Sequence, residues 1–112
     1  HAPVIYYPAD ASPKILRAEN TPLGVLQEPV FVNQEIRLDV DDLLIIATDG
    51  LIDLSDTGDS LLGHIRLMQL LEQYRSEPIS VIATKLFEVA DEHSPCSLPH
   101  DDQTLLIIRG TQ

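Results

Sequence analysis

Residues 43–50 read LLIIATDG, and this segment decides how the rest of the chain is arranged. Its first five residues are apolar without alternation, which predicts a β-strand buried on both faces, because half-buried strands alternate apolar and polar side chains. A second run of this kind, QTLLIIR, occupies residues 103–109. We therefore expect the two runs to be neighbouring strands at the centre of one sheet.

Weaker strand signals precede this segment. Residues 4–7 and 14–17 are short β-forming runs on either side of the loop PADASP, which predicts a hairpin. Residues 20–25 read NTPLGV and predict an irregular turn. Residues 35–39 alternate polar and apolar side chains, which predicts a further strand with one face in water.

After residue 50 the apolar period changes from that of a strand to that of a helix. The spacing predicts helices over residues 61–75 and 78–92, with Pro78 in the first turn, where its missing N–H costs nothing. Their apolar positions are Leu62, Ile65, Leu67, Met68, Leu71 and Tyr74 in the first, and Ile79, Ile82, Leu86, Val89 and Ala90 in the second. The predicted fold class is α+β, with an antiparallel sheet and helices on one of its faces.

Length and composition set further bounds. The 112 residues suffice for a single domain, 1–112, and the 44% hydrophobic and 22% charged content is typical of a globular protein. No apolar run approaches the ~20 residues that span a membrane, and no signal peptide is visible. The net charge of −11 argues against a nucleic-acid partner. The single cysteine, Cys96, excludes an internal disulfide and favours a reducing compartment such as the cytoplasm. Because the chain does not begin with Met, we expect it to be a piece of a longer protein.

Acidic residues are placed where the two central strands would meet. If these strands pair antiparallel, Asp49 and the pair Asp101–Asp102 lie at the same edge of the sheet. Carboxylates that converge there repel one another unless a cation lies between them, and oxygen ligands suit Mg²⁺ or Mn²⁺. Taken singly, an Asp-Gly pair or a double Asp is more often a plain turn.

A zinc site is the weaker metal hypothesis. The spacing of His93, Cys96 and His100 resembles that of zinc ligands, but a structural zinc ion normally has four nitrogen or sulfur ligands, and the other histidines are distant in the sequence. We interpret residues 93–100 as a loop.

The order of these motifs resembles that of a known family. The segments TDGLID at 48–53 and DDQT at 101–104 each adjoin an apolar strand, as in the metal-dependent protein phosphatases. More narrowly, the chain resembles the bacterial SpoIIE-like branch. Shorter segments match it in order: HAP at 1–3, PLGV at 22–25 and LGHIRL at 62–67.

The resemblance covers the C-terminal half of that catalytic domain. It implies half of an α-β-β-α sandwich with a binuclear Mn²⁺ or Mg²⁺ centre at one end. Asp49 and Asp101 match metal ligands, Asp102 matches their supporting neighbour, and Asp53 falls where some relatives place an acid near an additional metal. The remaining ligands lie in the N-terminal half, so we expect this chain alone to be inactive, to expose apolar surface and to self-associate.

The resemblance implies a serine/threonine protein phosphatase. Its substrate would be a regulatory phosphoprotein, such as an anti-sigma-factor antagonist in bacterial stress signalling. The alternative is a catalytically inactive phosphatase-like module that acts by binding another protein and is linked to a response-regulator receiver.

Overall fold

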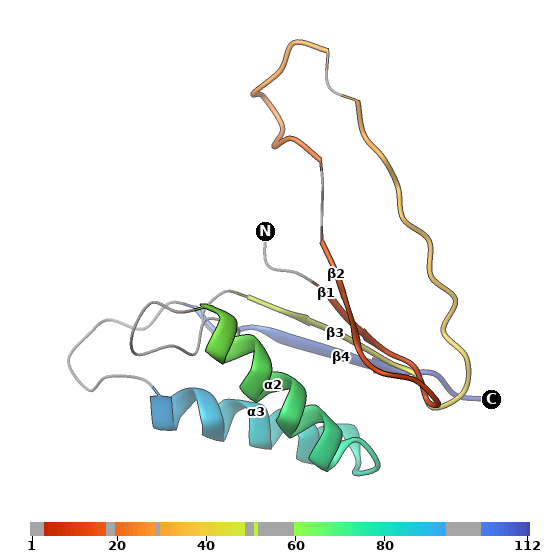
Figure 1. Ribbon diagram of the computed structural model, residues 1–112, viewed down its shortest axis with the longest axis vertical. Coiled ribbons are helices and arrows are strands. Elements are labelled where there is room, and N and C mark those ends of the chain that lie inside the picture. The colour runs from red at the N-terminus through yellow and green to blue at the C-terminus, as the bar shows by residue number, and fades with distance from the viewer. Residues whose placement is uncertain (1–3, 18–19, 29, 49–50, 52–59, 94–101) are drawn as a thin grey trace.

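The computed structural model describes residues 4–17, 20–28, 30–48, 51, 60–93 and 102–112 (Figure 1). It contains four strands and two long helices in these ranges, which confirms the predicted α+β class. In chain order they are β1 (Val4–Tyr7), β2 (Lys14–Leu16), β3 (Leu43–Ala47), α2 (Ser60–Tyr74), α3 (Ile79–His93) and β4 (Leu105–Arg109).

The four strands form one antiparallel sheet in the order β2-β1-β3-β4. Ile45, at the middle of β3, lies opposite Ile5 of β1 on one side and Ile107 of β4 on the other. The predicted pairing of the two apolar runs and the predicted hairpin of β1 and β2 are therefore both confirmed.

Both helices lie on the same side of the sheet, as predicted (Figure 1). The core between them and the sheet is aliphatic. Its buried side chains are Ile5, Tyr7, Leu43, Ile45, Ala47, Leu51, Leu67, Leu70, Leu71, Ile82, Leu86 and Ala90. The predicted apolar face of α2 is wrong at Ile65, which is 47% exposed, and it missed Leu70, which is buried. In the ranges described, neither helix combines the length and apolarity needed to cross a bilayer.

No helix of the described ranges lies on the opposite face of the sheet. Leu44 and Ile46 are only partly buried there, and Leu106 and Ile108 are 51% and 38% exposed. The prediction that both apolar runs are buried on two faces is therefore wrong for this outer face, because a helix layer covers only the inner one. The outward-facing side chains of β3 and β4 are apolar, and Leu44 and Ile46 also line a hollow of about 450 Å³ together with residues of the chain that follows β2, such as Val32 and Ile36.

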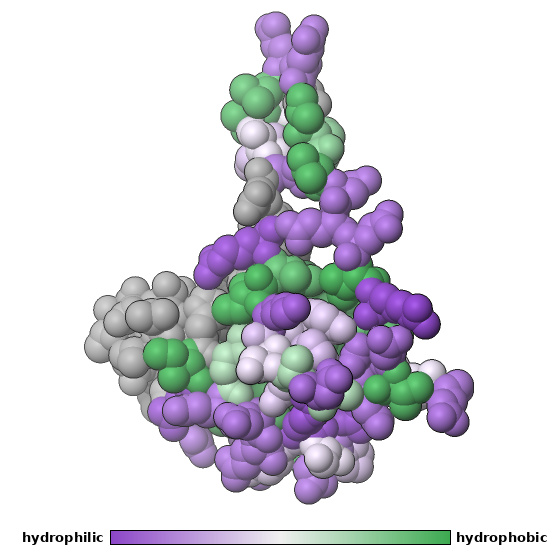
Figure 2. Space-filling view, turned by 45° about the vertical axis from the view of Figure 1, so that its right-hand side comes forward, coloured by the Kyte–Doolittle hydropathy of each residue, from purple (hydrophilic) through white to green (hydrophobic). Residues whose placement is uncertain are grey.

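A long excursion connects β2 to β3, and it projects away from the sheet (Figure 1). The strand predicted at residues 35–39 is wrong, since this stretch forms no ladder with another strand. Side chains hold it instead: Asn20 bonds both the N–H and the carbonyl of Val32, and the Tyr6 hydroxyl reaches the Arg37 carbonyl. The predicted turn near residue 24 is present, with Gly24 at a φ of +85°. Hydrophobic side chains gather near the tip of this loop (Figure 2).

Candidate functional site

The last hydrogen bonds between β3 and β4 are made by a threonine. The Thr48 N–H donates to the Thr104 carbonyl at 3.1 Å, one step beyond the Ala47–Leu105 pair. The Thr48 hydroxyl donates to the Asp102 carbonyl at 2.8 Å and accepts from the Thr104 N–H at 3.0 Å. One side chain thus holds together the end of β3 and the start of β4.

The predicted metal-binding residues adjoin this threonine in the sequence. Asp49 and Asp101 lie outside the described residues, as does Asp53. Asp102 is described and is exposed to solvent, and its carbonyl accepts the bond from Thr48. The structure therefore brings together the flanks of the predicted site, residues 48 and 102, which are 54 positions apart in the chain.

The donor set at this edge would consist of oxygen atoms. Asp49, Asp101 and Asp102 offer carboxylates, and no Lys or Arg occurs from residue 39 to residue 59. Such a set fits a hard divalent cation such as Mg²⁺ or Mn²⁺. In the part of the chain that the structure describes, no three His, Cys, Asp or Glu residues form a group that would hold a metal ion.

A different aspartate is buried at the opposite end of β3. Asp42 is 4% exposed and accepts hydrogen bonds from the Ala9 N–H at 2.7 Å, the Asp39 N–H at 2.9 Å and the Tyr6 hydroxyl at 2.9 Å. The backbone N–H groups of Asp39 and Ala9 lower the pKa of Asp42, because they stabilise its charged form. The hydrogen bond that the Tyr6 hydroxyl donates to Asp42 raises the pKa of Tyr6, because it stabilises the protonated hydroxyl. This carboxylate has a structural role.

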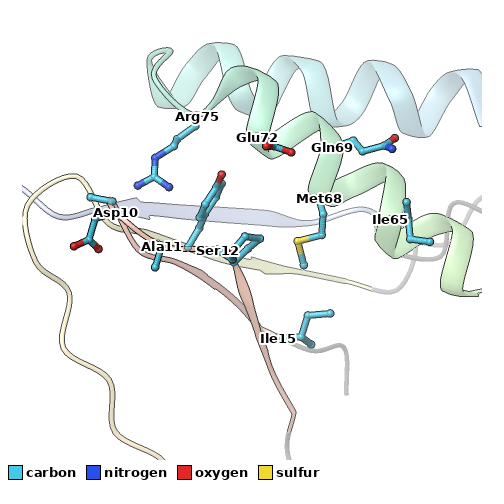
Figure 3. Close-up of a pocket in the computed structure, with 12 residues that line it drawn as sticks. Asp10, Ala11, Ser12, Ile15, Ile65, Met68, Gln69, Glu72 and Arg75 are labelled. Atoms are coloured by element: carbon cyan, nitrogen blue, oxygen red, sulfur yellow. The ribbon is translucent and has the colours of Figure 1, made fainter.

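An open groove of about 820 Å³ lies between the β1–β2 hairpin and α2 (Figure 3). Ile15, Ile65 and Met68 give it apolar walls, and Arg75 closes one end. The Arg75 guanidinium lies 4.2 Å from the centre of the Tyr7 ring, which places a cation over an aromatic face.

Sequence reasoning missed three of these functional or structural positions. Thr48 precedes Asp49, a predicted metal ligand. This neighbouring position is the feature of the sequence that could have indicated a role for Thr48. No motif marks Asp42, because its burial depends on donors from residues 6 and 9, which are distant in the sequence. Arg75 follows a helix in a position where an exposed arginine is normal, so nothing in the sequence marked it.

Comparison with known proteins identifies the family of this chain. The family model described as Stage II sporulation protein E (SpoIIE) matches residues 1–111. Searches of curated proteins and of solved structures found no match. The family model covers almost the whole chain, and the SpoIIE family is part of the PPM phosphatase superfamily. This chain belongs to the SpoIIE family and carries a PPM-type phosphatase domain sequence.

Proposed function

We propose that this chain supplies the C-terminal part of a metal-dependent serine/threonine protein phosphatase, with Asp49, Asp101 and Asp102 as metal-binding residues. The observation that carries the proposal is the bonding of Thr48 to Asp102 and Thr104. It joins the residue that precedes Asp49 to the residue that follows Asp101.

The residues of the chain prepare this edge for a cation. The Thr48 hydroxyl holds the two strand ends together, and the Leu51 N–H donates to the Thr48 carbonyl at 3.0 Å. These bonds hold Thr48 and Leu51, the described residues that precede and follow Asp49–Gly50 in the chain. The carboxylates would then hold Mn²⁺ or Mg²⁺, which supplies Lewis-acid stabilisation of a transferring phosphoryl group.

The proposed substrate is a phosphoserine or phosphothreonine residue of a regulatory protein, such as an anti-sigma-factor antagonist in the bacterial cytoplasm. This part of the proposal rests on the likeness to the SpoIIE-like phosphatases. Three carboxylates do not complete two coordination shells, so the remaining ligands would come from outside residues 1–112. Residues 1–112 alone are therefore expected not to hydrolyse phosphate esters.

The test is the substitution Asp49→Asn in a protein that carries the complete phosphatase domain. Asparagine preserves the shape of the side chain but removes the charge that holds the cation. We expect at least a ~100-fold loss of Mn²⁺-dependent phosphoserine hydrolysis, since a lost metal contact costs several kcal/mol at the transition state. Activity is measured against Mn²⁺ concentration, and circular dichroism verifies the fold.

Asp91→Asn is the matched control, because Asp91 is an exposed acid on α3. It should leave the Mn²⁺ curve unchanged. If Asp49→Asn and the wild type give the same curve, Asp49 is a turn residue, and the alternative of a phosphatase-like binding module replaces this proposal.

A further inference from the structure

A second, smaller cavity lies at the end of the sheet away from Thr48. It measures about 280 Å³ and is lined by Ala9, Asp41, Arg75, Ser76 and Arg109. Arg109 ends β4, and the length of that strand separates the cavity from the Thr48 edge by roughly 14 Å. The cavity is therefore distinct from the proposed metal site.

Arg75 reaches this cavity from the end of α2, and Figure 3 shows it on the side of the hairpin where Asp10 lies. Its stacking on Tyr7 orients the guanidinium. Its Nη2 atom is buried and has no hydrogen-bond partner in the residues that the structure describes. A buried N–H group without an acceptor is rare in folded proteins, and a bound water or ion is one of the explanations for it.

Arg109 contributes a second guanidinium that is held in position. Its Nη2 donates to the Arg75 carbonyl at 2.8 Å and to the Glu77 carbonyl at 2.7 Å. A guanidinium carries five N–H donors, so three remain beyond these two bonds. Arg109 thus ties the loop between α2 and α3 to β4 and keeps donor capacity for a further acceptor.

Basic residues outnumber acidic ones in the lining of the cavity, although the chain as a whole carries −11. Two arginines face one acid, Asp41, in its lining. The ion pairs formed among the described residues are Arg37–Asp39 and Lys85–Glu88, so neither arginine of the cavity takes part in one. The charge of Arg75 also acts on Asp42, whose pKa it helps to lower.

We propose that Arg75, Ser76 and Arg109 bind a phosphate group. Two guanidinium groups and a hydroxyl suit a tetrahedral oxyanion, because arginine pairs with phosphate through parallel N–H donors. The volume is below the range of pockets that enclose whole drug-sized ligands, which favours a small group. The site is independent of the metal centre and does not rest on the proposed function.

Two sources can supply the same chemistry: free inorganic phosphate and a phosphoserine side chain of another protein. The test titrates the ¹⁵N-labelled chain with inorganic phosphate and, separately, with a short phosphoserine peptide, at constant ionic strength. The Nε–Hε signals of the arginines are followed by NMR. We expect saturable shifts at Arg75 and Arg109 in the millimolar range, and the tighter of the two ligands identifies the source.

Arg75→Gln should weaken binding by at least tenfold. Arg66→Gln is the matched control, since it removes the same charge from an exposed position on the same helix and should change affinity less than twofold. If Arg75→Gln does not fold, Ser76→Ala on the exposed loop replaces it and should weaken binding severalfold. The proposal is overturned if neither ligand gives saturable shifts at these arginines, or if Arg66→Gln weakens binding as much as Arg75→Gln.

Discussion

At the entry to β3, a single carboxylate connects segments that are far apart in the chain. Asp42 accepts donors from Tyr6, Ala9 and Asp39, and so it fixes the hairpin turn and the end of the excursion against the sheet. All three contacts favour the ionised form. The folded state therefore holds the pKa of Asp42 below its ordinary value of 3.8.

Asp42→Asn should destabilise the fold. An amide cannot accept from all three donors, and its NH₂ group would face N–H groups of the backbone. Because the folded pKa is lowered, the stabilisation by Asp42 is complete above pH ~4 and disappears as the pH falls through the folded value. We expect a melting temperature several degrees lower for the variant at pH 7, and a smaller difference from the wild type near pH 2.

Thermal melts between pH 2 and pH 7 measure this effect. Asp10→Asn serves as the control, because Asp10 is an exposed acid on the same hairpin. An unchanged melting temperature for Asp42→Asn at pH 7, or a difference from the wild type that does not shrink at acid pH, would contradict a role for this carboxylate.

Thr48 acts through its hydroxyl rather than through its size. Thr48→Val keeps the shape of the side chain and removes both bonds to the start of β4, each of which contributes about 1 kcal/mol. In the complete phosphatase domain we expect about a five- to thirtyfold weaker response to Mn²⁺, from the 1 to 2 kcal/mol lost in holding the strand ends together. Mn²⁺ titration of phosphoserine hydrolysis measures the change.

Thr48→Ser restores the hydroxyl and should recover most of the response. Thr104→Val is a second control, since residue 104 takes part in these bonds through its backbone. If Thr48→Val behaves like the wild type, the hydroxyl does not position the metal-binding residues.

Among the elements, those with a strong local pattern were predictable from the sequence. The long apolar runs predicted β3 and β4. The 3.6-residue period predicted α2 and α3, with bounds within a few residues of those observed. The failure at residues 35–39 has a physical cause. An alternating pattern indicates that the side chains of a segment suit a strand. A strand also needs hydrogen bonds to a neighbouring backbone, and the local sequence does not show whether such a neighbour is present.

The end of β4 contains a close approach that only glycine permits. Gly110 donates to the Asp42 carbonyl and accepts from the Asp41 N–H, both at 2.9 Å. A Cβ added at Gly110 would overlap the Asp39 carbonyl oxygen. Asp41, with a φ of +66°, completes the tight turn on the other side.

Gly110→Ala should therefore displace this turn from β4. Overpacking of this kind costs about 1 to 3 kcal/mol, and urea unfolding measures it as a lower midpoint with a similar slope. Thr111→Ala, at the next, exposed position, should leave the midpoint unchanged. Equal midpoints for Gly110→Ala and the wild type would mean that the turn can move to accommodate the methyl group without a loss of stability.

At the scale of the whole molecule, the two helices that the structure describes cover the same face of the sheet. Leu106 and Ile108 lie exposed on the outer face, beside the partly buried Leu44 and Ile46. Exposed apolar side chains on a sheet favour association with another apolar surface. The chain on its own is therefore expected to self-associate.

Leu106→Glu should reduce this association without disturbing the core. Sedimentation equilibrium should show the wild type shifting to higher mass with concentration and the variant remaining monomeric. Ile65→Glu is the matched control, because Ile65 on α2 is about as exposed as Leu106 (47% against 51%) but lies away from the outer face of the sheet. If the wild type stays monomeric at high concentration, the outer face of the sheet does not mediate self-association.

The candidate site was predictable only in part, and for a reason that belongs to the whole molecule. Antiparallel pairing of the two apolar runs implies that Asp49 and Asp101–Asp102 share one edge, and the observed register has the strand ends where this argument requires them. The cavity at Arg75 and Arg109 was not predictable. It forms where the hairpin turn, the turn before β3, the loop after α2 and the last strand meet, and each contributes one or two residues with no motif of their own.

The central pairing of the sheet also determines how this chain must fold. Ile45 pairs with Ile5, 40 positions earlier, and with Ile107, 62 positions later. Among the described elements, the β1–β2 hairpin and the α2–α3 pair form from contacts between neighbours in the chain. The two pairings of β3 each require the closure of a long loop, whose entropic cost is met before the contacts stabilise anything. We therefore expect β4, which pairs with β3 across the longer separation, to join the sheet last, and until it does the unpaired edge of β3 is open to a strand of another molecule.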